Sequence, residues 1–166
     1  MSLHRELHLA RPFTLCAHEA VLNIYYTGSC LKKRVDQILA TVGLTDVQFN
    51  LMMLLKYQTA EDGGLGQSEL SAMMLVNRAN ITALVDRMER AGLVVRRSSD
   101  LDRRRNVVRL TAHGDALLDQ IEPLYAGEVN RVMSVLSESG QRQLISTLEC
   151  IRGNIRPGRP GPGAAK

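Results

Sequence analysis

Apolar residues recur at steps of three and four along most of the chain, which is the spacing of one face of an α-helix. This pattern predicts one long helix over residues 13–42, which Gly43 ends. Thr45 is a favourable N-cap for a second helix that continues to about Thr59. The glycine-rich run after that helix predicts a turn.

Two shorter helices are expected next. The first extends from about residue 68 to residue 74, with Leu70 and Met73 on its inner side. The second begins after Asn77, a favourable N-cap, and Gly92 closes it as the first residue beyond its C-terminus. The apolar residues of this second helix have the spacing of a buried face and are Ile81, Leu84, Val85 and Met88.

The sequence becomes strand-like after Gly92. Residues 93–97 and 106–110 are rich in valine and predict two β-strands, with a charged loop at 98–105 between them. Two helices followed by a hairpin with a basic tip make a winged helix-turn-helix arrangement. The expected fold is therefore mainly α with a small β-hairpin wing.

Two further helices and a tail complete the expected fold. Thr111 is a suitable N-cap for the first helix, and the second starts at about Ser137. Pro123 should kink the first helix or split it near Ile121, because proline removes a backbone donor and clashes with the preceding turn. Residues 156–166 are rich in proline and glycine and are expected to form a disordered tail.

The basic residues are unevenly distributed. Residues 76–111 hold nine arginines, no lysine and four acidic residues, whereas the rest of the chain carries a net charge of −1. Positive charge gathered in one segment favours an anionic partner. Arginine in every basic position suits phosphates and base edges, because the guanidinium group forms paired hydrogen bonds with both.

The helix after Asn77 has the properties needed to read duplex DNA. The major groove admits one α-helix, and phosphate contacts on either side hold it there. Ala79 and Ala83 on the polar side let the backbone approach the DNA, and the N-terminal part of such a helix usually meets the bases. We assign direct base readout to Arg78, Asn80, Thr82 and Arg87.

The hairpin tip suits a minor groove, whose narrow walls concentrate negative potential. It carries Arg103, Arg104 and Arg105, and Asp102 is placed to hold the Arg104 guanidinium by a paired hydrogen bond. Gln67 and Ser68, at the start of the third helix, complete the residues assigned to DNA contact. The alternative is a winged helix that contacts only an acidic protein partner.

Several motifs together resemble the MarR family of bacterial transcriptional regulators. The most specific is the wing, where Asp102-x-Arg104 is followed by Leu110-Thr111-x-x-Gly114, after Ala91-Gly92-Leu93. The matching stretches are 44–49, 67–70, 85–94, 102–104 and 108–114. The resemblance covers roughly residues 17–155.

The resemblance implies a single MarR-type domain over residues 12–155, with a winged-helix core at 45–111 and dimerisation helices at 12–42 and 112–155. It also implies a homodimer on a pseudo-palindromic operator, and repression that a small ligand or an oxidant relieves. The apolar faces of the first and last helices support the homodimer independently, because the compact core could not cover them alone. Pro123 and Asn106 depart from the family pattern.

Two kinds of signal are candidates for control of the regulator that the resemblance implies. A small anionic or phenolic effector is expected where the first helix meets the core, near His18, Tyr25 and Tyr26, although each of these residues also fits a core or interface role. The alternative is a redox-sensing repressor that uses Cys16. Peroxide-sensing members of the family, which the chain partly resembles, use a reactive N-terminal cysteine assisted by tyrosines.

Other functions find little support in the sequence. The three cysteines are far apart and form no C-x-x-C pair, and the histidines have no metal-ligand spacing, so we expect no disulfide framework and no metal site. Without a Ser/His/Asp set or a glycine-rich phosphate loop after a strand, we expect neither enzymatic activity nor a cofactor. No apolar run approaches about 18 residues, which predicts a cytoplasmic protein without membrane contact.

Overall fold

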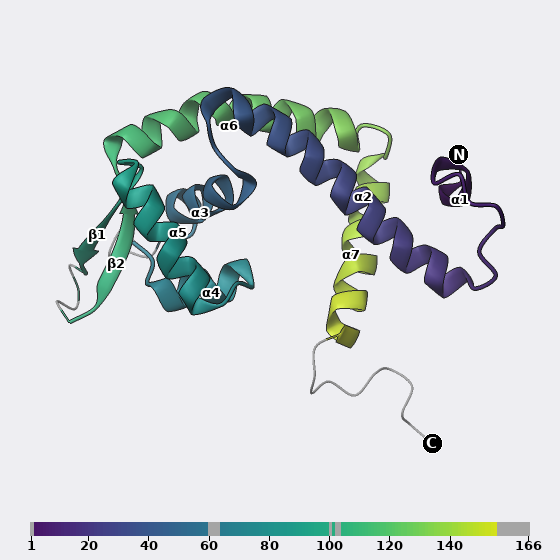
Figure 1. Cartoon of the computed structure of the whole chain (residues 1–166), viewed down its shortest axis with the longest axis horizontal. Coiled ribbons are helices and arrows are strands. Elements are labelled where there is room, and N and C mark those ends of the chain that lie inside the picture. The colour runs from purple at the N-terminus through teal and green to yellow at the C-terminus, as the bar shows by residue number, and fades with distance from the viewer. Residues whose placement is uncertain (1, 60–63, 100, 102–103, 156–166) are drawn as a thin grey trace, which may run out of the picture. The chain divides into compact units, whose positions relative to one another are not determined.

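The structure is a computed structural model that describes residues 2–59, 64–99, 101 and 104–155 (Figure 1). Its helices and strands are, in chain order, α1 (Leu3–Glu6), α2 (Cys16–Leu39), the 3₁₀ turn η1 (Ala40–Val42), α3 (Asp46–Tyr57), α4 (Gln67–Met74), α5 (Arg78–Arg90), β1 (Val94–Ser98), β2 (Asn106–Leu110), α6 (Ala112–Met133) and α7 (Glu138–Ile155). The chain divides into two compact units, Met1–Leu124 and Tyr125–Lys166, so that the boundary falls within α6. The predicted mainly α fold with a two-stranded wing is confirmed.

The helix ends follow the capping residues that the sequence predicts. The Thr45 hydroxyl accepts a hydrogen bond from the Gln48 backbone N–H at 3.3 Å, and the Gln48 side chain accepts one from the Thr45 N–H at 2.9 Å. The Asn77 side chain accepts from the Asn80 N–H at 2.9 Å and so begins α5. Gly92, with φ +71°, ends it in the left-handed region that glycine adopts most readily.

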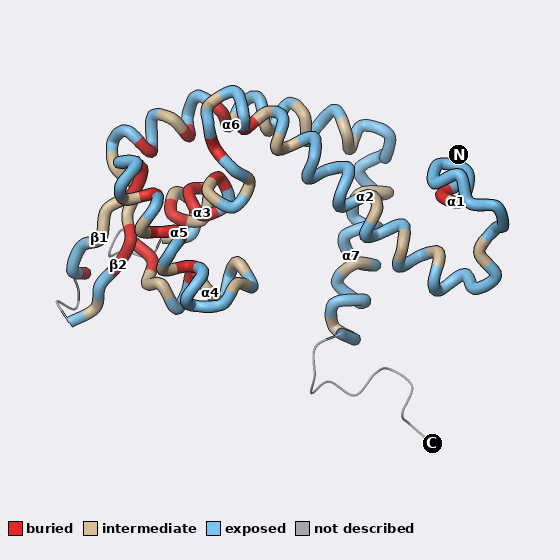
Figure 2. The backbone as a smooth tube through the Cα atoms, viewed as in Figure 1, coloured by how far each residue is buried: buried red, intermediate tan, exposed pale blue. Residues whose placement is uncertain are grey.

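The core of the first unit lies between α3, α5, the strands and the first turns of α6 (Figure 2). Helix α5 buries the four apolar residues that the pattern assigned to its inner face. The largest fully buried side chains of this unit include Phe49, Leu51, Met52, Leu70, Ile81, Met88, Leu118 and Ile121. This core fixes the position of α5 and leaves its polar side at the surface.

The wing is an antiparallel pair in which Val94 lies opposite Leu110 and Ser98 lies opposite Asn106. Leu65 extends this sheet through two backbone hydrogen bonds with Val108, at 3.1 and 2.8 Å. The strands therefore connect to the segment that leads into α4 as well as to the end of α5.

Thr111 ties the wing to the start of α6. Its hydroxyl accepts from the Gly114 N–H at 3.0 Å and donates to the Gly92 carbonyl at 2.6 Å. The Thr111 N–H donates to the Leu93 carbonyl at 3.1 Å. The predicted N-cap is confirmed, and it joins the end of α5, strand β2 and α6 at one point.

Of the two outcomes expected at Pro123, a kink or a split, the split is wrong, because α6 contains Pro123 and continues to Met133. Helix α3 holds the turns before the proline: Lys56 forms ion pairs with Asp115, at 3.3 Å, and with Asp119. The Tyr57 hydroxyl donates to Glu122. These contacts, with the burial of apolar α6 residues beside them, offset the one helical hydrogen bond that proline removes.

Three other expectations differ from the structure. Met73 is 48% exposed, because it lies at the end of α4 beside an open hollow, and Leu70 alone in α4 is buried. Helix α2 begins at Cys16, later than expected, since Leu15 is still extended, with φ −115°. The short helix α1 was not expected. The anticipated tail at 156–166 lies outside the described residues.

Helix α7 leaves a continuous apolar stripe at its surface. Leu144, Leu148, Ile151 and Ile155 follow one another at steps of four, three and four, so they share one face of the helix, and no residue of α7 is buried.

Among the described residues, no single helix is long and apolar enough to cross a membrane. The pair Cys16–Val42 and Asp46–Tyr57, bent by 80°, passes that test only when taken together.

Candidate nucleic-acid interface

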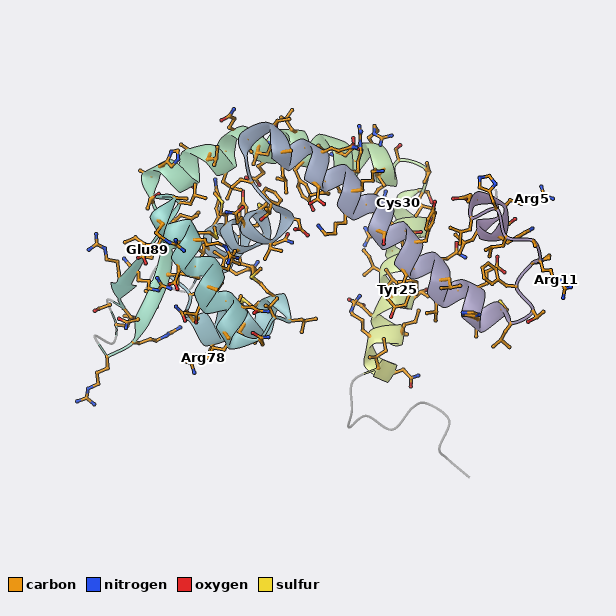
Figure 3. The ribbon with its side chains drawn as sticks, viewed as in Figure 1. Arg5, Arg11, Tyr25, Cys30, Arg78 and Glu89 are labelled. Carbon is orange, nitrogen blue, oxygen red and sulfur yellow. The ribbon has the colours of Figure 1, made fainter. Side chains whose placement is uncertain are left out.

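Helix α5 presents a polar surface on the side opposite its buried residues. Arg78, Asn80 and Arg87 are all exposed there. Figure 3 shows Arg78 at the beginning of α5, with its side chain pointing away from the helix. Neither Arg78 nor Arg87 forms an ion pair with a carboxylate among the residues that the structure describes. The guanidinium groups of both residues are thus accessible to an anionic partner.

Thr82, also assigned to base readout, is placed differently. It is half-buried, and its hydroxyl donates to the Arg78 carbonyl at 3.0 Å. The two polar atoms of the Gln67 amide are assigned from their neighbours. This places the amide nitrogen toward Thr82, where it donates to the hydroxyl at 3.0 Å. Thr82 therefore connects α5 to the start of α4.

Arg96, on β1, forms a cluster that the sequence reasoning missed. Its guanidinium forms ion pairs with Asp86 and Glu89 of α5 and donates to the Gln67 amide oxygen at 3.2 Å. The Arg96 backbone N–H donates to Glu89 at 2.9 Å, and Figure 3 shows Glu89 near the end of α5. The spacing of Asp86 and Glu89 was an available signal, because residues three apart share a helix face.

The cluster changes the proton affinities of its members. The Arg96 backbone N–H lowers the pKa of Glu89 most strongly, and the guanidinium lowers it further, against partial desolvation that raises it. Desolvation lowers the pKa of Arg96, but the hydrogen bonds and charges of Asp86 and Glu89 outweigh it and raise that pKa above its ordinary value. The charged forms are therefore favoured, and the cluster persists at neutral pH.

A concave surface of about 610 Å³ lies where α4, α5 and the wing meet. Its lining includes Gly66, Gln67, Ser68, Arg78, Arg96 and Arg105. Arg78, which forms no ion pair among the described residues, and the first backbone N–H groups of α4 favour an anion there, whereas Arg96 and Arg105 already contact carboxylates. The concave surface thus brings together residues assigned to DNA contact from three parts of the sequence.

Glu69 is the acidic residue of this concave surface. Its carboxylate accepts from the Gly66 N–H at 2.7 Å and forms an ion pair with Arg105. Arg105 accordingly contacts α4, and does not simply extend from the hairpin tip. Ser68 and Arg104 are exposed. Asp102 and Arg103, and therefore the hydrogen bond expected from the Arg104 guanidinium to the Asp102 carboxylate, lie outside the described residues.

The residues assigned to an effector all lie on α2. His18 and Tyr25 are exposed and Tyr26 is half-buried, and His18 packs edge-on against Phe13 with ring centroids 5.9 Å apart. Cys16, the candidate redox residue, is exposed at the first turn. A second hollow of about 610 Å³ lies along α3 and the end of α4 and is largely apolar. Neither described hollow contains any of these four residues.

Comparison with known sequences identifies relatives among bacterial regulators. The profile of the MarR family matches residues 42–105. The transcriptional regulator MhqR of Bacillus subtilis is 32% identical over 114 residues, which cover 69% of this chain and 76% of MhqR. The transcriptional repressor MprA of Escherichia coli is 30% identical over 141 residues, which cover 85% of this chain and 73% of MprA.

Solved structures share the fold. CouR from Rhodococcus jostii, bound to p-coumaroyl-CoA, superposes with a TM-score of 0.75 at 24% identity, covering 84% of this chain and 95% of CouR. A mutant of MarR from E. coli in complex with operator DNA superposes with a TM-score of 0.70 at 18% identity, covering 91% of this chain and 99% of that protein. At these identities the likeness concerns the fold alone.

Proposed function

The chain belongs to the MarR family and is a DNA-binding transcriptional regulator, and from this premise we propose that it is a homodimeric repressor that recognises a specific pseudo-palindromic operator. The observation that supports this most is the surface of α5. Arg78, Asn80 and Arg87 are exposed on it, while the apolar residues of the same helix anchor it in the core. A rigid helix with accessible donors is what base readout in the major groove requires.

The neighbouring concave surface supplies the phosphate contacts in this proposal. Arg78 of α5 and Ser68 of α4 both line it, and so does Arg105, next to the start of β2. Phosphate contacts orient a protein on the duplex, and base contacts then select the sequence. Arg103 and Arg104 extend this basic surface into the minor groove in our proposal.

Selection of bound duplexes from a random pool tests the proposed function directly. We expect a symmetric consensus whose half-sites are one helical turn apart, ~34 Å between centres, as two recognition helices of a dimer require. Equal binding to selected and scrambled duplexes at the same salt concentration would instead favour a winged helix that contacts only a protein partner.

Asn80→Ala and Arg104→Ala should affect DNA binding in different ways. Asparagine forms paired hydrogen bonds with adenine, so the Asn80 variant should lose preference at one base pair, weakening binding to the selected duplex about 5- to 150-fold. The Arg104 variant should weaken binding to all duplexes similarly and reduce the slope of log affinity against log salt by about 1. Affinity titrations at several salt concentrations measure both effects, and a uniform loss in both variants would contradict the assigned roles.

The homodimer and its control complete the proposal. The apolar stripe on α7 supports a second copy of the chain as its cover, because apolar side chains at the surface are stabilised when a partner removes them from water.

We propose that a small anionic or phenolic effector binds near His18, Tyr25 and Tyr26 and favours dimers whose recognition helices are wrongly spaced. The relative CouR binds p-coumaroyl-CoA, a phenolic ligand that also carries anionic groups, which supports this effector class.

A further inference from the structure

We propose that Arg96 is a positioning residue for sequence readout: through Gln67 and Thr82 it sets the orientation of α5 relative to α4 and the wing. This inference rests on the proposed function, since it concerns how the same helix distinguishes one duplex from another. Arg96 belongs to none of the residue sets assigned to DNA contact from the sequence.

The guanidinium of Arg96 joins three elements at once. It lies on β1, it forms ion pairs with both carboxylates on one face of α5, and its Nε and one terminal nitrogen donate to the Gln67 oxygen of α4, each at 3.2 Å. The side chain is only 28% exposed, so its contacts are partly shielded from water. A planar group with several fixed donors can hold these acceptors in one relative arrangement, which the single ammonium of lysine cannot do.

The contacts continue from Arg96 to the base-reading surface. The Gln67 amide nitrogen donates a hydrogen bond to the Thr82 hydroxyl at 3.0 Å, and that hydroxyl donates to the backbone carbonyl of Arg78 at 3.0 Å. Arg78 is itself an exposed residue at the start of α5. The series of contacts therefore begins at the wing and ends on the backbone of a residue assigned to the bases.

A small rotation of α5 should affect the two kinds of DNA contact unequally. Hydrogen bonds to base edges weaken steeply with misalignment, so they depend on a helix held in one orientation. Attraction to phosphates is long-ranged and tolerates displacement, and it supplies most non-specific affinity. Loss of the Arg96 contacts should therefore lower discrimination between duplexes more than it lowers affinity for DNA in general.

Arg96→Lys tests this inference, because it keeps the charge and removes the fixed set of donors. We expect the ratio of affinities for the selected and scrambled duplexes to fall about tenfold, with little change in affinity for the scrambled duplex. Arg97→Lys is the matched control, since Arg97 is the next residue of β1 and is exposed. That variant should leave the ratio unchanged.

Thr82 provides a second test that does not depend on the folding of the Arg96 variant. Thr82→Val removes the hydroxyl at constant shape and should lower the same ratio, whereas Thr82→Ser should restore it. In the double variant Arg96→Lys/Thr82→Val the ratio should fall no further than in the more affected single variant, because both changes interrupt one series of contacts.

Several outcomes would overturn the inference. An unchanged ratio in Arg96→Lys, with a lower unfolding temperature or a smaller salt slope, would show a stabilising or phosphate-binding role instead. Additive losses in the double variant, with Thr82→Val altering preference at one base pair, would make Thr82 a direct base contact. If the wild-type protein did not discriminate between duplexes, the proposed function itself would be refuted. The wild-type measurement shows this before any variant is compared.

Discussion

Replacement of Gly114 by alanine should destabilise the protein by about 3 kcal/mol and lower its unfolding temperature by roughly 10 °C. A Cβ at this buried position would overlap the Leu93 carbonyl oxygen and lie only 3.0 Å from its carbonyl carbon. The backbone cannot simply move away, because the same carbonyl accepts hydrogen bonds from Thr111. Thermal and denaturant unfolding followed by circular dichroism measure the effect.

Gly127→Ala is the matched control for this prediction. Gly127 lies in the same helix, and a Cβ added there would meet nothing within 4 Å. Alanine is favoured over glycine inside a helix by about 1 kcal/mol, so this variant should be as stable as the wild type or slightly more so. If both variants unfolded at the wild-type temperature, the close packing of α6 against the Leu93 carbonyl would be contradicted.

Ile151→Glu should convert the proposed dimer into monomers and weaken operator binding by about 100-fold or more. Ile151 lies in the middle of the apolar stripe on α7, where a carboxylate would have to lose its hydration at the proposed contact with the second copy. Two half-sites bound together gain affinity from their linkage, and a monomer forfeits that gain. Light scattering gives the mass, and titration with the selected duplex gives the affinity.

Ser146→Glu introduces the same charge on the opposite side of α7 and serves as the control. Ser146 is exposed, and at about 100° per residue it lies away from the stripe, so the dimer and its affinity should be retained. A dimeric Ile151→Glu variant with full operator affinity would refute the assigned interface. Circular dichroism of the variant separates loss of the dimer from loss of the fold.

Helix boundaries that depend on a few neighbouring residues could be predicted from the sequence. Thr45, Asn77 and Thr111 cap their helices through their own side chains, and Gly92 ends α5 with a positive φ, so each boundary could be predicted from a few residues. The inner face of α5 was equally predictable, since its spacing specifies which side is buried. The continuity of α6 through Pro123 was not predictable, because it depends on contacts with α3, far away in the sequence.

The residues of the candidate interface likewise include some whose placement could be predicted from the sequence and some whose placement could not. The exposure of Arg78, Asn80 and Arg87 followed from the helical period of α5 alone. The inward orientation of Thr82 and the ion pair between Arg105 and Glu69 depend on how α4 and the wing lie against α5, and hydrophobic periodicity says nothing about that arrangement. For Arg96 the sequence shows only that Asp86 and Glu89 share a face of α5, and its ion pairs with them depend on how β1 lies against that face.

The uninterrupted helix α2 limits what oxidation can do to this protein. Cys16 and Cys30 are fourteen residues apart on it, which places their Cα atoms ~21 Å apart at the rise of an α-helix. A disulfide needs about 6 Å, so these two thiols cannot close a ring within one folded chain. Any covalent link between them must join separate chains, and it would appear on a denaturing gel without reductant as a band of doubled mass.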